Sequence, residues 1–377
     1  MKITTRISAA GVVLAAASAL LAAAPAQAAT VRSADHGVVF AQSDNPSGNT
    51  VVAYDRAADG ALTQAGVYST GGLGGVLQGS AVDHLASQHS LVYDQAHHLL
   101  YAVNAGSDTV SVFQVDGDHL LRTQVISSGG SFPVSIAVRG DRVYVLNALD
   151  GGSVQGFVRE GCTLVAVADW HRGLGLAPVT GPMQFTHTPA QVSFTPDGSA
   201  LVVTTKAGGN SIDVFPFDDH GAPSAQPVTN AVPNAVPFGF VFDAAGRLVV
   251  TEAGPNAVAT FTLARDGKVT PVSSVATGQA ATCWIVRTGN KLYASNAGSG
   301  TLSGYRERHG MLTSLGTTMT GAGTTDAAVS PDGRDLYVQT GAAGVVDGFR
   351  VHGDGSLTPI GSVTVPDGIG GEGIVVA

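Results

Sequence analysis

One carboxylate, Glu252, has the sequence context of a reactive group. It ends the apolar run LVVTE and is followed by the turn residues AGPN. A carboxylate in such a place can act as a general base, or can bind a cation or a hydroxyl group. The alternative is a solvated carboxylate, or one that accepts hydrogen bonds from backbone amides. Asp326, which precedes the run AAVS, could supply a second carboxylate if the fold brings the two side chains together.

Further side chains that could bind a ligand lie at or beside the ends of similar apolar runs. They are Asn104, Asn147, His187, Gln191, Lys206, Phe238, Trp284, Asn296 and Asp326. For the asparagines we favour a structural role, because Asn before Ala or Gly bonds to nearby backbone in tight turns. Phe238 and Trp284 could form an apolar or sugar-stacking platform, or could pack in the core.

Motifs of several other chemistries are missing from the sequence. It contains no Gly-x-Ser-x-Gly elbow, no His-Glu-x-x-His and no phosphate-cradling glycine loop. No close pair of His or Cys has metal-ligand spacing, so we expect neither a metal nor another cofactor. The formal net charge of -9, with scattered Lys and Arg, argues against nucleic acid as a partner. A small molecule or a glycan remains as the expected ligand.

The elements that position these residues belong to an internal repeat. A short apolar run, a turn such as PDG, a second run that ends in a small or polar residue, and a Val- and Phe-rich third run recur about every 45 residues. Seven copies of a repeat that is mostly strand predict an all-β, seven-bladed β-propeller with four strands in each blade. The expected ends of the second strands are Asn45, Asn104, Asn147, Thr205, Glu252, Asn296 and Thr340.

Two of the intervals between these positions are longer than one blade. The extra residues fall at 71–89 and 170–187, each ahead of an innermost strand. Both loops should therefore lie on one face of the propeller, near the mouth of the central channel. Loops longer than packing requires often carry function, although a neutral surface insertion would look the same.

The two ends of the chain complete this organisation. Residues 1–28 have the charged start, apolar stretch and Ala-x-Ala ending of a secretory signal peptide, so we expect cleavage after Ala28 and export of residues 29–377 as a single domain and a monomer. No later apolar run is long enough for a membrane span. Residues 37–42 resemble a second strand with no first strand ahead of it, and residues 371–377 supply the missing strand and close the ring. Cys162 and Cys283 fall in different blades, so both should be free thiols.

The blade pattern, the PDGRDLY turn and the outer-strand segment GSLTPIG resemble the seven-bladed lactonase family, which includes bacterial 6-phosphogluconolactonases and fungal carboxymuconate cyclases. The resemblance implies a catalytic His at the start of the fourth innermost strand, an Arg-His at the fifth, a Glu at the end of the next strand and an Arg in the sixth blade. Here these positions hold Ala190, Phe238-Gly239, Glu252 and Ala297. Only the Glu is kept.

Two functions stay open. The first is an exported propeller that binds a small organic or glycan ligand at the channel mouth without the catalytic set of the family. The second is a lactone hydrolase or cyclase that uses Glu252 as its general base. We favour binding, because the missing arginines would have stabilised the oxyanion of lactone opening.

Overall fold

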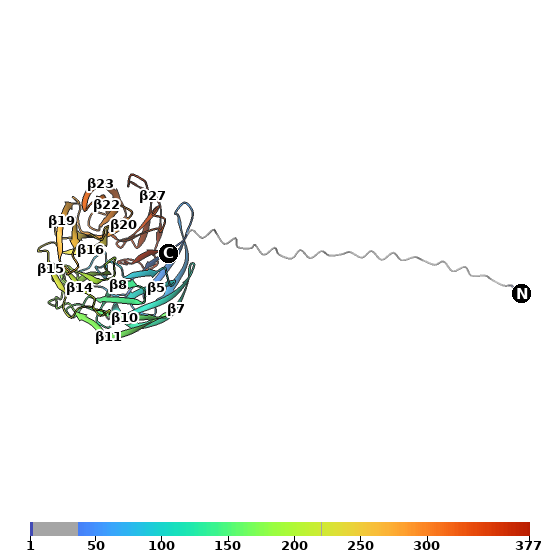
Figure 1. The fold of residues 1–377 in the computed structure, drawn as a ribbon. Coiled ribbons are helices and arrows are strands. Elements are labelled where there is room, and N and C mark those ends of the chain that lie inside the picture. Colours follow the sequence, from blue (N-terminus) through green and yellow to red (C-terminus); the bar gives the residue numbers. More distant parts are fainter. Residues whose placement is uncertain (3–36, 220) are drawn as a thin grey trace. The chain divides into compact units, whose positions relative to one another are not determined.

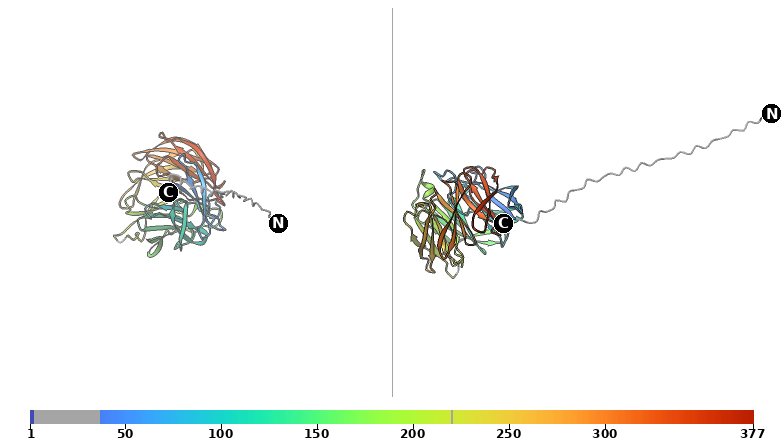
Figure 2. Two further views of the ribbon diagram at one scale, coloured as in Figure 1. Left: turned by 90° about the vertical axis from the view of Figure 1, so that its right-hand side faces the viewer. Right: turned by 90° about the horizontal axis from the view of Figure 1, so that it is seen from above.

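A computed structural model describes residues 1–2, 37–219 and 221–377. Apart from Met1 and Lys2, the predicted signal peptide lies outside the described residues. Its predicted cleavage site also lies outside them. Seven four-stranded antiparallel sheets form the blades of a propeller (Figure 1; Figure 2). The predicted fold class is therefore confirmed.

Each blade runs from an innermost to an outermost strand. Blade 1 contains β28 (Ile374–Val376), β1 (Val38–Gln42), β2 (Thr50–Arg56) and β3 (Leu62–Ser69), and blade 2 contains β4 (Leu91–Asp94), β5 (Leu99–Asn104), β6 (Thr109–Asp116) and β7 (His119–Ser127). Blade 3 contains β8 (Pro133–Arg139), β9 (Arg142–Asn147), β10 (Ser153–Glu160) and β11 (Thr163–Gly173). Blade 4 contains β12 (Pro189–Phe194), β13 (Ala200–Thr205), β14 (Ser211–Pro216) and β15 (Val228–Ala231).

Blade 5 contains β16 (Pro237–Phe242), β17 (Leu248–Glu252), β18 (Ala257–Leu263) and β19 (Val269–Ala276). Blade 6 contains β20 (Thr282–Thr288), β21 (Lys291–Asn296), β22 (Thr301–Arg308) and β23 (Met311–Met319). Blade 7 contains β24 (Thr324–Val329), β25 (Asp335–Thr340), β26 (Val345–Val351) and β27 (Leu357–Thr364). The described residues contain two single-turn 3-10 helices, η1 (Ala105–Ser107) and η2 (Gln184–Thr186). None of the described helices is long and apolar enough to cross a membrane.

The second strands end at the predicted residue in six of the seven blades. In blade 1 the predicted end, Asn45, is wrong by three residues, because β1 ends at Gln42. Asn45 lies in the following turn, where its side-chain oxygen accepts a hydrogen bond of 2.8 Å from the backbone N–H of Ser47. An asparagine in a turn and an asparagine at a strand end look alike in sequence.

The C-terminal strand closes the ring by completing blade 1. β28 pairs antiparallel with β1, with Ile374 opposite Ala41 and Val376 opposite Val39. The backbone N–H of Gln42 also donates to the carbonyl of Gly373 at 2.8 Å. Strands β1 and β28 are thus held in one sheet, as the sequence predicted.

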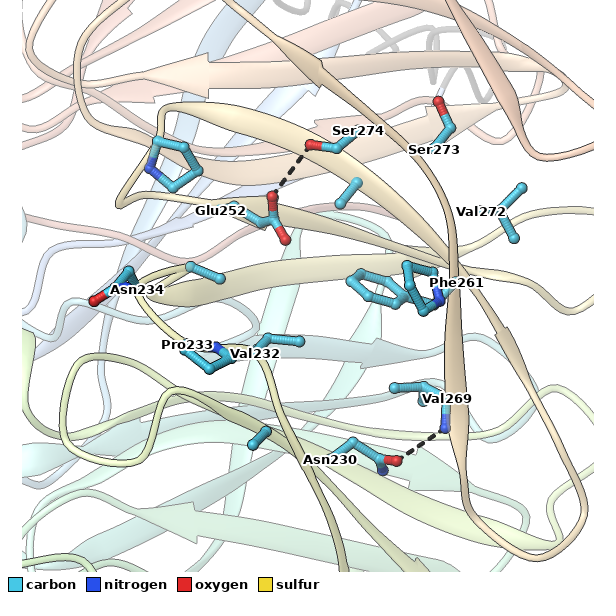
Figure 3. Close-up of a pocket in the computed structure, with 15 residues that line it drawn as sticks. Asn230, Val232, Pro233, Asn234, Glu252, Phe261, Val269, Val272, Ser273 and Ser274 are labelled. Carbon is cyan, nitrogen blue, oxygen red and sulfur yellow. Dashed lines mark hydrogen bonds between the residues drawn. The ribbon is translucent and has the colours of Figure 1, made fainter.

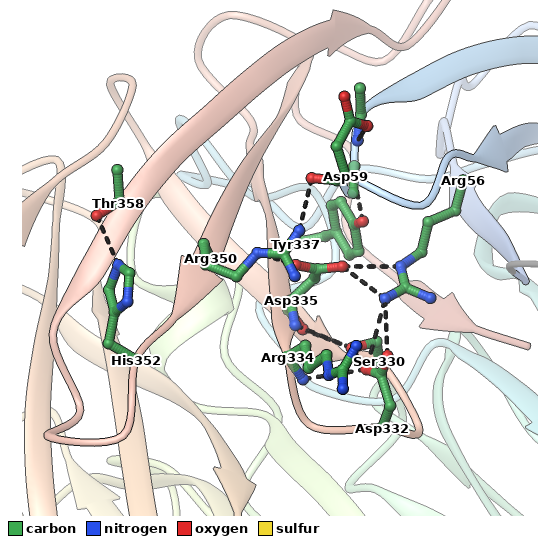
Figure 4. Close-up of polar contacts among 12 residues, drawn as sticks. Arg56, Asp59, Ser330, Asp332, Arg334, Asp335, Tyr337, Arg350, His352 and Thr358 are labelled. Atoms are coloured by element: carbon green, nitrogen blue, oxygen red, sulfur yellow. Dashed lines mark hydrogen bonds and ion pairs between the residues drawn. The ribbon is translucent and has the colours of Figure 1, made fainter.

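Buried charges fasten blade 7 to blade 1 (Figure 4). The fully buried carboxylate of Asp335 lies 3.0 Å from Nε of Arg56 in blade 1 and 3.1 Å from Nε of Arg350. The hydroxyl of Tyr337 donates to the carbonyl of Gly60 at 2.7 Å. Elsewhere the blades pack through apolar faces, because alternate residues of each strand point into the interface with a neighbouring blade. Both cysteines are free, as expected.

Candidate functional site

The channel mouth, where the sequence placed the site, is filled by the chain's own loop. Residues 82–89, named the plug here, belong to the first long loop, between β3 and β4. The backbone N–H of His84 donates to Gly370 ahead of blade 1 at 2.8 Å, and the hydroxyl of Ser87 donates to Val134 of blade 3 at 2.7 Å. The plug therefore fastens to several blades at once.

Gln88 extends this fastening across the channel. Its backbone N–H donates to the carbonyl of Ala190 in blade 4 at 3.1 Å. Its side-chain amide donates to the carbonyl of Ile285 in blade 6 at 2.8 Å and accepts from the backbone N–H of the same residue at 3.1 Å. The side chain of Gln88 thus makes the pair of hydrogen bonds to Ile285 that a neighbouring strand's backbone would make.

Small residues make room for the plug. A Cβ at Gly239 would lie 2.1 Å from Oε1 of Gln88, and one at Gly341 would lie 1.8 Å from the carbonyl oxygen of Val82. Ala190 and Gly239 occupy two of the positions where the lactonase resemblance implies catalytic histidines. At Gly239 the missing side chain admits the plug, with which a larger side chain would collide.

The second long loop joins the first, so the two loops lie together as expected. The backbone N–H of Gln78 donates to Oε1 of Gln184 at 2.8 Å. His187 is half-buried in this loop, and its Nδ1 lies 2.9 Å from the carbonyl of Met183, beside a cavity of about 120 Å³. The loop is shorter than the predicted 170–187, because β11 continues to Gly173.

The three asparagine candidates are buried and hold strand ends together. The amide of Asn104 donates to Ser111 at 2.8 Å, and the amide of Asn296 donates to Ser303 at 3.0 Å. Asn147 donates to the carbonyl of Ser128 at 3.3 Å. These contacts are those of a structural role.

Lys206, Phe238 and Trp284 lie beneath the plug. The ammonium of Lys206 donates to the carbonyl of Ala86 at 2.5 Å and lies 5.3 Å from the centroid of the Phe238 ring. The Trp284 indole donates to the carbonyl of Ser87 and packs against Phe238 with ring centroids 5.0 Å apart. Because all three are buried, the plug separates them from any ligand outside the channel.

Gln191 connects blades 4 and 5. Its side-chain amide donates to the carbonyl of Phe240 at 3.0 Å and accepts from the Phe240 backbone N–H at 2.6 Å. It also lies 3.2 Å from Nδ1 of His89, and burial lowers the pKa of that imidazole to about 4.

Four buried carboxyl groups lie within the plug or next to it. They are Asp44, Asp83, Asp326 and Glu372. Burial raises the pKa of Asp44 to about 7 and that of Asp326 to about 7. The sequence singled out only Asp326, although Glu372 lies within residues 371–377, the predicted closing segment. Nothing in the local sequence of Asp44 or Asp83 separates them from ordinary turn residues.

Glu252 does not pair with Asp326, contrary to one possibility raised by the sequence. It shares a face of blade 5 with Leu248 and Val250, because alternate residues of a strand point the same way, and this face packs against blade 4. The side chain extends toward the outer strand, where Ser274 donates to its Oε2 at 3.3 Å (Figure 3). Asp326 remains at the channel, under the plug.

The side chain of Glu252 lines a groove of about 800 Å³ between blades 4 and 5. The groove exists because β15 has four residues, whereas the outer strands of the other blades have eight to eleven. The chain turns away after β15 and leaves part of the face of blade 5 uncovered (Figure 3). Asn230 limits one end, since its Oδ1 accepts from the backbone N–H of Val269 at 2.9 Å.

The walls of the groove are apolar and polar but carry no positive charge. Pro233, Pro255, Pro271 and Phe261 contribute apolar surface, and Ser273, Ser274 and Asn234 contribute hydrogen-bonding groups. Among its described lining residues there is no Lys, Arg or His. Partial burial raises the pKa of Glu252, with the Ser274 hydrogen bond acting in the opposite direction. Within the described residues, no three side chains of His, Cys, Asp or Glu gather as metal ligands do.

Solved structures share this fold. A putative 6-phosphogluconolactonase from Bacteroides fragilis superposes with a TM-score of 0.72 at 18% identity, covering 92% of this chain and 99% of its own. A periplasmic gluconolactonase from Pseudomonas aeruginosa has a TM-score of 0.70 at 16% identity, covering 90% and 98%. No curated protein matches the chain. A family model described as "Lactonase, 7-bladed beta-propeller" matches residues 31–254, and the chain therefore belongs to this family.

Proposed function

We propose that the protein is an exported lactonase-fold propeller that binds a small organic or glycan ligand, and that the ligand lies in the groove of Glu252 rather than at the channel mouth. One observation carries this proposal. Glu252, the family position that this chain keeps, has a half-buried carboxylate in a groove of about 800 Å³. The other candidates at the mouth lie beneath the plug or serve as structural contacts. Ligand sites are typically concave and mostly apolar, with a few converging polar groups.

The charges of the groove select the kind of ligand. A carboxylate with no cation among the described lining residues attracts hydroxyl and ammonium groups and repels anions. The proline and phenylalanine surface suits an apolar or sugar ring. We therefore expect a neutral hydroxylated or an amine-bearing ligand, and weak binding of phosphorylated or carboxylated sugars.

Lactone hydrolysis is the second candidate. The raised pKa of Glu252 brings it closer to that of a general base, which could take a proton from water as the water attacks a lactone carbonyl. Hydrolysis also needs donors for the oxyanion. The described groove offers the side chains of Asn234, Ser273 and Ser274 but no cation, so we place hydrolysis second.

Calorimetric titration with matched sugars tests the proposal. Neutral sugars, aldonolactones and amino sugars should bind, and Glu252→Gln should weaken the best of them about tenfold or more, because hydrogen bonds to charged groups contribute about 1.5–3 kcal/mol. Glu160→Gln is the control, since Glu160 is an exposed carboxylate at the end of β10. Unchanged affinity in Glu252→Gln would remove the groove from the function. Lactone turnover that Glu252→Gln abolishes would instead establish the hydrolase.

A further inference from the structure

Two carboxyl groups meet where the plug lies on blade 1. The side chains of Asp83 in the plug and Glu372, just ahead of β28, are hydrogen-bonded to each other. Glu372 is fully buried and Asp83 nearly so. Two carboxylates cannot donate to each other, so this contact needs one proton between them.

The same carboxyl groups hold the backbone of the plug. Oδ1 of Asp83 accepts from the backbone N–H groups of Leu85 at 3.1 Å and Ala86 at 2.9 Å. Oε2 of Glu372 accepts from the backbone N–H of Ser87 at 3.2 Å, and its Oε1 contacts the oxygen of the Ser87 hydroxyl, whose single proton is donated to the carbonyl of Val134. The shared proton therefore lies at the point where the plug is attached to the propeller.

The charge near Asp83 and Glu372 can balance one negative charge on this pair. The ammonium group of Lys206 interacts electrostatically with both carboxyl groups, and burial lowers its pKa to about 8. With one shared proton the pair carries a charge of minus one, which the ammonium of Lys206 balances. Asp44 and Asp326 add further buried carboxyl groups on the same side. His84 and His89 within the plug and Cys283 beside it are the other titratable groups nearby. Burial lowers the pKa of His89 to about 4 and raises the pKa of the Cys283 thiol to about 12, so neither of these two side chains is charged near neutral pH.

We propose that the plug is locked by the proton shared between Asp83 and Glu372, and that loss of this proton loosens the plug and opens the channel mouth. A second negative charge in this buried place would have no cation to pair with, and an unpaired buried charge is strongly unfavourable. Release of the plug is the smallest rearrangement that brings water to both groups. Burial and the mutual repulsion of the two groups raise the pKa of Glu372 well above its ordinary value, which favours retention of the shared proton.

Opening would uncover a site that differs from the groove of Glu252. Lys206, Phe238 and Trp284 would then face solvent, and they combine a cation with two aromatic rings. The two sites would prefer ligands of opposite charge. This proposal does not depend on ligand binding in the groove.

Hydrogen exchange in the intact protein tests the lock. Protection of the plug amides, corrected for the intrinsic rate at each pH, should fall at least tenfold between pH 5.5 and 8. Protection in β9 should change little by comparison. In Asp83→Asn the amide can donate to Glu372 without a titratable proton, while its oxygen still accepts from Leu85 and Ala86. The fall should then be several times smaller, and Asp116→Asn, at an exposed strand end, should behave like the wild type.

Tryptophan emission gives a second measurement that needs no change at the lock. The chain has two tryptophans, and Trp170 stacks on Tyr144, so Trp170→Phe leaves Trp284 as the reporter under the plug. Its emission should shift to longer wavelength and become quenchable by acrylamide as pH rises from 5.5 to 8. Constant plug protection and constant Trp284 emission over this range would overturn the proposal. An equal pH response in Asp83→Asn would overturn the assignment of the proton to this pair.

Discussion

Single hydroxyl groups decide how neighbouring blades are joined near the channel. Thr251 of blade 5 donates to the carbonyl of Cys283 in blade 6, and its oxygen accepts from the backbone N–H of Gly239 at 3.0 Å. Thr204 of blade 4 similarly donates to the carbonyl of Phe238 in blade 5 at 2.6 Å. At the corresponding place in blade 6 the buried hydroxyl of Ser295 has no partner among the described residues. The same position in the blade therefore supplies an inter-blade hydrogen bond in blades 4 and 5 but not, among the described residues, in blade 6.

This difference gives a matched pair of variants. Thr251→Val keeps the shape but leaves buried backbone groups unpaired, and should lower the free energy of unfolding by about 1–3 kcal/mol. Ser295→Ala removes a hydroxyl that has no partner in the described structure, and should change it by less than about 0.5 kcal/mol. Urea unfolding of both variants measures the difference. Equal losses would show that the ring of inter-blade hydrogen bonds is not what Thr251 contributes.

The missing side chain of Gly239 matters as much as the hydroxyl groups. Gly239→Ala would bring a methyl group to 2.1 Å from Gln88 Oε1 and 2.8 Å from the carbonyl of Cys283. Such overpacking costs about 1–3 kcal/mol, and the plug is the part that must move. We expect a lower melting temperature and faster hydrogen exchange in residues 82–89. Gly353→Ala, where a methyl group would meet no atom within 4 Å, should keep both at wild-type values.

At the scale of elements, strand length and strand order shape the surface. The four residues of β15 leave the groove of Glu252 open, and the three residues of β28 complete blade 1. The same short closing segment carries Glu372, which holds the plug. Closure of the ring and closure of the channel mouth therefore depend on one stretch of chain.

Deletion of residues 371–377 tests this dependence. The truncated protein loses the innermost strand of blade 1 and the Glu372 contacts to the plug, so an unpaired edge and the apolar residues behind it are exposed. We expect the melting temperature to fall by roughly 5–10 °C. A synthetic peptide of residues 371–377 should recover part of the loss by adding a strand to β1. A truncated protein that melts like the full chain would contradict the role of this segment.

At the scale of the whole molecule, the buried carboxyl groups predict an unusual pH dependence. The pKa values of Asp44 and Asp326 are each about 7 in the folded protein, and burial also raises those of Asp83 and Glu372. The folded state therefore holds protons that the unfolded state has released above about pH 4. Each such group lowers the free energy of unfolding by up to about 1.4 kcal/mol per pH unit as pH rises toward 7.

Unfolding in urea between pH 5 and 7.5 measures this effect. His89, with its pKa lowered to about 4, acts in the opposite direction below pH 6.5, but one imidazole does not offset several carboxyl groups. Stability should therefore fall from pH 5 to 7.5, and Asp326→Asn should make the decline shallower. A free energy of unfolding that rises steadily over this range would show that these groups ionise as freely in the folded as in the unfolded chain.

The sequence by itself determined the number of blades, the ends of six of the seven second strands and the closing strand. These features depend on local signals, namely the alternation of apolar residues along each strand and the Pro-Asp-Gly type of turn between strands. Turn chemistry repeats in every blade, so six of the second strands ended where the sequence predicted. The structural role favoured for the asparagines follows from the same chemistry and agrees with their contacts.

Only the tertiary structure decided what lies at the channel mouth and where Glu252 points. Residues 82–89 have no periodic pattern, and their place depends on partners such as Gln88 with Ile285 and Ser87 with Val134, which are far apart in the chain. The groove of Glu252 likewise depends on a short strand in the neighbouring blade. Local sequence carries the rules of strands and turns, whereas the fit of a loop into a channel depends on the shape left by side chains from all the blades.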